Sequence, residues 1–117
     1  MRLLSRSNRT REDRLAAGSI VVIEGARSTT ISVQPGQKVV VGRDPGANVV
    51  LSDPRVSPNH TLIERSGPGW LVRSLDAANP TWILDPTGRA QPISVEVGLR
   101  SGELVVGGCQ LLLYPPS

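Results

Sequence analysis

The side chains of this sequence that could bind or react are concentrated in the stretch 42–60. Arg43 follows a β-rich run, and one polar loop further on carries the other candidates, Arg55, Ser57, Asn59 and His60. A guanidinium presents a permanently charged fork to two oxygens at once, and a serine hydroxyl adds a short neutral donor. Two such loops, joined by a short apolar strand, predict a binding site for an anion.

A catalytic role for the same loop is the first alternative. Ser57 and His60, with Asp53 or Asp76, supply the residue types of a hydrolytic triad. The sequence has no Gly-x-Ser-x-Gly turn, however, and closeness along one loop does not establish the geometry of a triad. His60 is the only histidine, and we interpret it as structural. We therefore expect no enzymatic activity, no catalytic residue, no metal and no cofactor.

Length and charge limit the other functions. The 117 residues suffice for one domain, and the single cysteine excludes an internal disulfide. Five arginines in the first 18 positions, with Glu12 and Asp13, give that segment a charge of 5 − 2 = +3, and the remaining 8 basic and 8 acidic residues cancel. We interpret residues 1–18 as a basic, disordered tail. The balanced body predicts no nucleic-acid partner, and no apolar run is long enough for membrane insertion.

Short runs rich in Val, Ile and Leu, separated by Gly and Pro, predict an all-β fold. The expected strands and extended pieces are 20–23, 29–34, 39–41, 48–51, 61–65, 70–75, 81–84, 91–97, 104–106 and 109–114. Their number and spacing predict a β-sandwich of two antiparallel sheets, with loops at one end forming the binding site. The sandwich is expected to span 19–114. Residues 115–117 read as the start of a Pro-rich linker or the C-terminal end.

Three motifs give the sequence a resemblance to a known family. They are Gly42-Arg43, Ser57-x-x-His60 and Asn79-x-Thr81-Trp82, supported by the runs 48–53 and 102–107. In this order and at these intervals they resemble the forkhead-associated (FHA) domain over nearly the whole chain after the tail. The resemblance implies a non-catalytic module that binds phosphothreonine peptides through the loops at one end of a β-sandwich.

The resemblance also implies roles for individual residues. It assigns the phosphate to Arg43 and Ser57, and phosphothreonine carries about −1.5 to −2 charges and three acceptor oxygens for them to hold. It assigns contacts with the ligand backbone to Asn79, with Asn59 as a further candidate in the neighbouring loop. Structural support of the site falls to Gly42, His60 and Thr81.

Arg55 is a candidate for ligand specificity. It lies two residues before Ser57, where some family members contact the third side chain after the phosphothreonine. A guanidinium at this place would favour an acidic ligand residue. The alternative interpretation is an exposed arginine of the loop.

Three residues depart from the family pattern. Pro58 stands where a further donor is usual, Ala78 lacks a hydroxyl that is common before the asparagine, and Pro80 replaces the glycine of an Asn-Gly-Thr turn. These departures predict weaker phosphate binding or an altered contact. They favour an alternative function, a phospho-independent protein-interaction or oligomerisation module.

The expected partner is a Thr-phosphorylated protein or peptide. The expected location is the cytoplasm, either as a separate protein or as the cytoplasmic domain of a larger, membrane-associated one. The start at Met1 and the Pro-Pro-Ser end predict the N-terminal domain of a longer protein.

Overall fold

The fold consists of β-strands. The computed structural model describes residues 17–115, and this range contains no helix. The strands are β1 (Gly18–Glu24), β2 (Arg27–Val33), β3 (Lys38–Gly42), β4 (Val49–Val50), β5 (Thr61–Ser66), β6 (Gly69–Ser74), β7 (Trp82–Leu84), β8 (Ala90–Pro92), β9 (Glu96–Leu99), β10 (Gly102–Val106) and β11 (Cys109–Tyr114). The first strand thus begins two residues before its predicted start at Ile20. Residues 1–16 of the predicted tail, and 116–117 of the predicted linker, lie outside the described residues.

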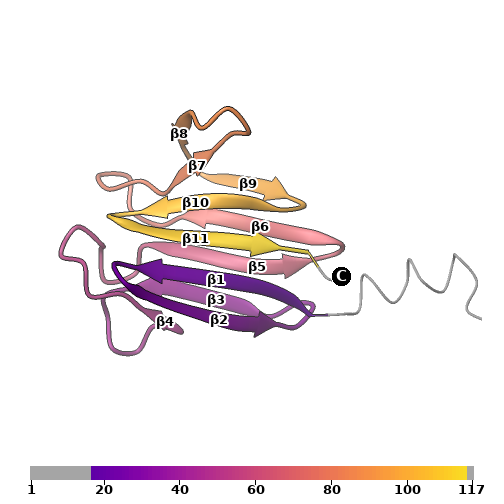
Figure 1. Cartoon of the computed structure of the whole chain (residues 1–117), viewed down its shortest axis with the longest axis horizontal. Helices are drawn as coiled ribbons and strands as arrows, with labels where there is room; N and C mark the ends of the chain where they lie inside the picture. Colours follow the sequence, from indigo (N-terminus) through magenta and orange to yellow (C-terminus); the bar gives the residue numbers. More distant parts are fainter. Residues whose placement is uncertain (1–16, 116–117) are drawn as a thin grey trace, which may run out of the picture.

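The strands form two sheets that face each other (Figure 1). The first has six strands in the order β2-β1-β11-β10-β7-β8, and the second has five in the order β4-β3-β5-β6-β9. Every pair is antiparallel except β3 and β4, which are parallel because the loop 43–48 carries the chain back beside Val41 before β4 begins. The predicted all-β two-sheet sandwich is confirmed, with one mixed sheet in place of two purely antiparallel ones.

An aliphatic core lies between the sheets. Along β1, Ile20 and Val22 are buried while their neighbours are partly exposed, and Leu111 and Leu113 of β11 alternate in the same way. This period of two directs one side of each strand inward. Burial of a side chain of this size contributes about 1.5–3 kcal/mol before the loss of chain entropy is counted. The core therefore forms without phenylalanine, and it provides a rigid support for the loops.

The segment 91–97, predicted as one extended piece, belongs to both sheets. Its first part lies in β8, which pairs with β7 in the first sheet, and its last part lies in β9, which pairs with β6 in the second. Pro92 has no N–H group and ends β8. Ile93 is then buried, and its N atom donates to the carbonyl oxygen of Thr81 at 2.8 Å. The prediction of one continuous piece was wrong because strand propensity does not report a change of sheet.

Five connections gather at the end of the sandwich opposite to the C-terminus (Figure 1). They are the β1–β2, β3–β4, β4–β5, β6–β7 and β10–β11 connections, each of which follows or precedes a strand that ends there. The residues predicted to bind a ligand belong to three of these connections. The fold therefore positions them at one end of a rigid body.

Candidate functional site

Gly42 ends β3 at the point where the β3–β4 connection meets the β4–β5 connection. A Cβ atom on Gly42 would lie 1.9 Å from the carbonyl oxygen of Pro58, a distance that no side chain tolerates. Because glycine has no Cβ, Arg43 N donates to Ser57 O at 3.0 Å, and Asp44 N donates to Pro58 O at 3.1 Å. Glycine at this position thus allows the two connections to be joined by backbone hydrogen bonds.

The side chain of Arg43 lies along the backbone that leads to Ser57. Its Nε atom donates to the carbonyl oxygen of Val56 at 2.5 Å. Within residues 17–115, the two terminal nitrogens of this guanidinium have no hydrogen-bond or ion-pair partner, and the residue is exposed. One edge of the guanidinium is fixed by the protein, and the other is available to an incoming anion.

The carboxylate of Asp76 collects the donors of the neighbouring connections. Ser57 Oγ donates to Asp76 Oδ2 in a short hydrogen bond, Ala78 N donates to Oδ1 at 2.9 Å, and Asn79 Nδ2 lies 3.4 Å from Oδ2. The hydrogen bond from Ser57, followed by that from Ala78, lowers the pKa of Asp76 to about 2. This carboxylate is therefore ionised at neutral pH, and it links Ser57 to Asn79.

His60 connects the site to the sheet through its backbone. Its N atom donates to Val41 O at 2.9 Å, and its carbonyl oxygen accepts from Leu75 N at 2.9 Å. The imidazole is buried, its two nitrogens have no hydrogen-bond partner in the described part of the chain, and burial lowers its pKa. Because Ser57 donates to Asp76 and not to this ring, the serine and the histidine do not form the pair that a serine hydrolase uses.

A buried pair of hydroxyl groups ties β5 to the β6–β7 connection. Thr61 Oγ1 and Thr81 Oγ1 are 2.6 Å apart, and both residues are fully buried. The N atom of Thr81 also donates to Ser74 Oγ at 3.1 Å. The segment that carries Asn79 is therefore anchored at Thr81, two residues further on, by two hydrogen bonds.

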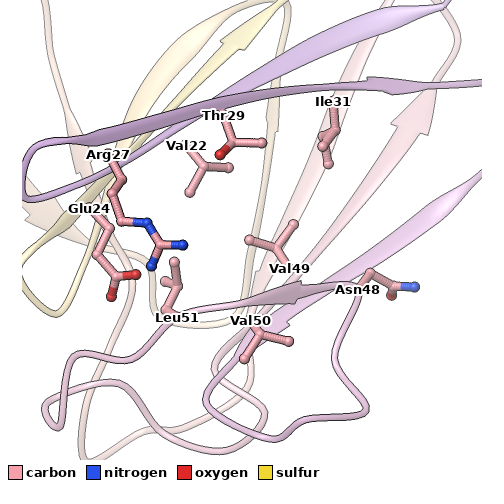
Figure 2. A pocket seen from close by; sticks show the side chains of 9 residues that line it. All are labelled: Val22, Glu24, Arg27, Thr29, Ile31, Asn48, Val49, Val50 and Leu51. Carbon is pink, nitrogen blue, oxygen red and sulfur yellow. The ribbon is translucent and has the colours of Figure 1, made fainter.

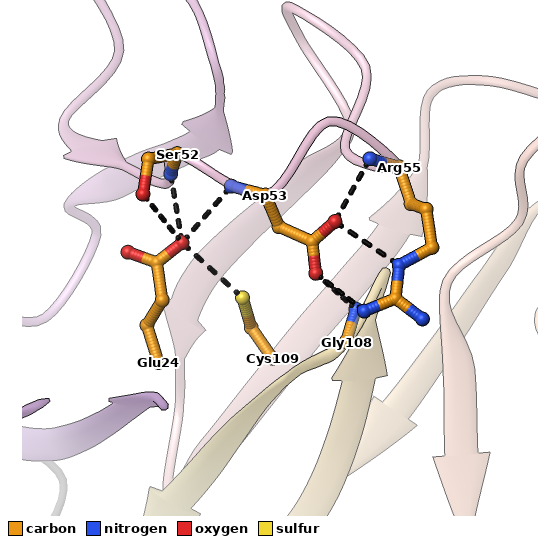
Figure 3. A network of polar contacts seen from close by, with 6 residues as sticks. All are labelled: Glu24, Ser52, Asp53, Arg55, Gly108 and Cys109. Carbon is orange, nitrogen blue, oxygen red and sulfur yellow. Dashed lines mark hydrogen bonds and ion pairs between the residues drawn. The ribbon is translucent and has the colours of Figure 1, made fainter. Parts of the chain in front are cut away.

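The side chain of Arg55 is held by Asp53 (Figure 3). Its Nε and Nη2 atoms donate to the two oxygens of Asp53 at 3.1 and 2.8 Å. This ion pair lowers the pKa of Asp53 well below its usual range. The Arg55 side chain remains 72% exposed. A ligand carboxylate at this place would share the guanidinium with Asp53.

The same network fixes the loop to β1 and to the β10–β11 turn (Figure 3). Glu24 Oε2 accepts from Ser52 N at 2.8 Å and from Asp53 N at 3.0 Å, and Gly108 N donates to Asp53 Oδ2 at 2.9 Å. Cys109 Sγ lies 3.6 Å from the same Glu24 oxygen, and burial raises the pKa of its thiol to about 11. The cysteine therefore stays protonated at neutral pH.

The structure brings together some of the predicted site residues and leaves others separate. Arg43 and Ser57 are joined through backbone, and Asn79 reaches Ser57 through Asp76. Asn59 is exposed, and its side chain has no hydrogen bond to another described residue. The contact of Asp76 with this group was missed. The sequence signal for this contact was the position of Asp76 at the start of a loop, where an Asp side chain often accepts from the N–H two residues further on, here that of Ala78, in an Asx turn.

A separate hollow of about 220 Å³ lies between the edge strands of the two sheets (Figure 2). Its lining is mixed, with apolar side chains such as Val22, Ile31 and Leu51 beside polar and charged ones. The side chains of Glu24 and Arg27 lie near one end of it. None of the predicted phosphate-binding residues lines this hollow.

Two other kinds of feature are absent from residues 17–115. No group of three or more His, Cys, Asp or Glu side chains is arranged to hold a metal ion. In the same range, no helix has the length and apolar character required to cross a membrane.

The two-sheet sandwich, with Gly42-Arg43, Ser57-x-x-His60 and Asn79-x-Thr81 at one end, defines the chain as an FHA domain, a class of non-catalytic interaction module. Comparison of sequences then identifies a particular family within this class. The family described as "inner membrane component of T3SS, cytoplasmic domain" matches residues 10–116, and the chain belongs to this family.

Relatives and solved structures agree with the assignment. The FHA domain-containing protein FhaB of Mycolicibacterium smegmatis is 32% identical over 98 residues, which are 82% of this chain and 63% of FhaB. The chain thus spans less than two thirds of that relative. The FHA domain of the CT664 protein from Chlamydia trachomatis has a TM-score of 0.74 at 25% identity, covering 87% of this chain and all of that one. Mycobacterium tuberculosis EmbR, in complex with a low-affinity phosphopeptide, shares the fold with a TM-score of 0.69 at 18% identity, covering 87% of this chain and 25% of EmbR.

Proposed function

We propose that this chain binds a Thr-phosphorylated protein or peptide, with Arg43 and Ser57 in contact with the phosphate. The observation that carries the proposal is the junction at Gly42, which sets the open edge of the Arg43 guanidinium beside the Ser57 loop. A phosphate group offers three acceptor oxygens and a charge of about −1.5 to −2. A charged fork and a hydroxyl suit that group. The phosphopeptide complex of EmbR supports the proposal for this fold.

The remaining residues receive supporting roles in this proposal. Asn79 contacts the ligand backbone beside the phosphothreonine, and Asn59 supplies a further loop contact. Gly42, His60 and Thr81 support the site from below, as their backbone and buried contacts suggest. The exposed Arg55 meets the third residue after the phosphothreonine.

The wider setting is also a proposal. The chain acts as a binding module without catalytic activity, in the cytoplasm or as the cytoplasmic domain of a larger protein. The description of its family as a cytoplasmic domain supports that location. The equal numbers of basic and acidic residues after position 18 support a protein partner over a nucleic acid.

A binding experiment tests the proposal directly. A degenerate phosphothreonine peptide library is captured on the immobilised chain, and the selected peptide is titrated with and without phosphatase treatment. Arg43→Ala is expected to weaken binding by at least about tenfold, the loss of one charge-assisted contact. Arg100→Ala removes an exposed arginine from the β9–β10 turn and is the control, with affinity expected near wild type. Capture of no phosphopeptide, or equal binding by Arg43→Ala and wild type, would refute the proposal.

A second candidate function, phospho-independent self-association, is favoured by the free edge of β2. This strand has seven residues, lies at the edge of its sheet and contains neither Pro nor Lys to protect it. The two-residue turn after Glu24 pairs this residue with Arg27, so the N–H groups of Ser28, Thr30 and Ser32 point away from β1. Two copies of β2 could pair antiparallel about Thr30, with their single charges at opposite ends.

Sedimentation equilibrium distinguishes this second candidate. Wild type is expected to form dimers without phosphopeptide, and Thr30→Pro to remain monomeric, because proline removes an outward N–H group. A wild type that is monomeric up to high concentration would exclude self-association through β2.

A further inference from the structure

Asp76 sits where the proposed ligand would have to form its bonds. Its carboxylate accepts from the Ser57 hydroxyl and from Ala78 N at 2.9 Å, and Asn79 Nδ2 lies 3.4 Å from it. Ser57 and Asn79 are the residues that we assign to the phosphate and to the ligand backbone. In the ligand-free domain, the Asp76 carboxylate therefore accepts hydrogen bonds from two groups that we propose as donors to the ligand.

Of these two donors, only the Ser57 hydroxyl is fully occupied by its hydrogen bond to Asp76. A serine hydroxyl has a single proton, so Ser57 cannot donate to Asp76 and to a phosphate oxygen at the same time. The amide of Asn79 has two N–H groups, so it can serve both. A carboxylate beside a bound phosphate also repels it, because like charges at this range disfavour each other. The ligand must therefore displace Asp76 or bind without the hydroxyl.

We infer that Asp76 is an internal competitor for the phosphate, which occupies the Ser57 hydroxyl in the free domain and lowers the affinity for every phosphothreonine ligand. The inference rests on the proposed function. Asp76 would thereby determine which ligands bind, because only a partner with enough additional contacts overcomes the competition for Ser57. Of the two residues assigned to the phosphate, Arg43 alone has side-chain donors without a hydrogen-bond partner within residues 17–115.

Asp76 also has a local structural role, which a test must distinguish from its competition with the phosphate. Its Oδ1 atom caps the turn at Ala78, as in an Asx turn. Asn at position 76 retains an oxygen for this cap and removes the charge, whereas Ala removes both. Asp44→Asn is the matched control, since Asp44 is an exposed acid next to Arg43 and its side chain has no hydrogen bond to Ser57.

The test is a titration of the phosphothreonine peptide selected from the library against three proteins, namely wild type, Asp76→Asn and Asp44→Asn. Asp76→Asn is expected to bind about tenfold more tightly than wild type, the effect of removing a charge-assisted competitor. Asp44→Asn is expected to stay within about twofold, since exposed charges without contact interact weakly through water. Should Asp76→Asn fold poorly, Asp76→Ser retains a short acceptor for the turn and replaces it.

A second measurement uses Ser57. In wild type, Ser57→Ala is expected to change the affinity by less than about threefold, because the hydroxyl is engaged by Asp76. In the Asp76→Asn background the same change is expected to weaken binding by about tenfold. A purely structural role for Asp76 would give the same effect of Ser57→Ala in both backgrounds.

The outcomes separate the inference from the proposed function. Wild-type binding with no gain in Asp76→Asn overturns the inference and leaves the proposed function intact. Binding by Asp76→Asn when wild type shows none supports the inference in its strongest form. Absence of binding in wild type and in all Asp76 variants refutes the proposed function, and the inference with it.

Discussion

The buried hydroxyl pair of Thr61 and Thr81 gives a quantitative test of how the site is supported. Both residues are fully buried, and their Oγ1 atoms are 2.6 Å apart. Changing one threonine to Val removes one partner and leaves the other hydroxyl buried beside a methyl group. Changing both removes both polar groups and leaves two apolar side chains of nearly the same shape. The single and double variants should therefore behave very differently.

The expected free energies follow from that asymmetry. Thr61→Val and Thr81→Val are each expected to lower the free energy of unfolding by about 1–3 kcal/mol, the cost of an unsatisfied buried polar group. The double variant is expected to lose less than about 1 kcal/mol, because no polar group is then left without a partner. The coupling energy between the two positions, the sum of the two single losses less the loss of the double variant, is accordingly about 1–6 kcal/mol. This is a sizeable part of the roughly 5–15 kcal/mol that stabilises a typical domain.

Urea unfolding followed by tryptophan fluorescence measures these values. Trp70 is 2% exposed in the folded chain, so its emission reports its transfer to water. Thr30→Val, on an exposed position of β2, is the control and should change the free energy of unfolding by less than about 0.5 kcal/mol. If the losses of the two single variants simply add in the double variant, the hydrogen bond between the threonines does not contribute and the reasoning is refuted.

Three further changes have defined outcomes. Gly42→Ala is expected to destabilise the fold by about 1–3 kcal/mol, since its Cβ would meet the Pro58 carbonyl, whereas Gly98→Ala meets only ordinary contacts; equal melting temperatures would contradict this. Arg55→Ala should abolish a preference for acidic residues at the third ligand position after the phosphothreonine, and a wild-type library profile without that preference would exclude the role. Burial lowers the pKa of His60 below its ordinary 6.5, so the unfolded chain binds more protons below about pH 6.5 and stability should fall from pH 7 to pH 5; a urea midpoint independent of pH in this range would disprove it.

The architecture could be predicted from the sequence because its signals are local. Alternating Val, Ile and Leu residues specify strands with one buried face, and Gly and Pro mark the turns between them. The pattern around Ile20 and Val22, for example, gives the observed buried side of β1. The order of the motifs at Arg43, Ser57 and Asn79 added the expected placement of a site at one end.

The contacts that were not predicted depend on residues distant in the sequence. Asp76 meets Ser57 across 19 positions, and Gly108 N meets Asp53 across 55 positions. Neither contact leaves a periodic trace in the sequence, because each follows from how the two sheets bring their loops together. The change of sheet at Ile93 has the same cause. It is visible only because β8 pairs with β7 in one sheet and β9 pairs with β6 in the other. Tertiary packing therefore decides the electrostatics of the candidate site.

The prolines of the site loops fit their positions because the hydrogen bonds around them use other backbone groups than a proline N–H. Pro58 has no N–H group, but its carbonyl oxygen accepts from Asp44 N at 3.1 Å. Pro80 precedes Thr81, whose N atom is the one that donates to Ser74. A proline restricts φ and so reduces the conformations that a loop loses on becoming ordered. On the proposed function, these prolines offset part of the affinity lost with the missing accessory donors, because a preorganised loop binds at a lower entropic cost.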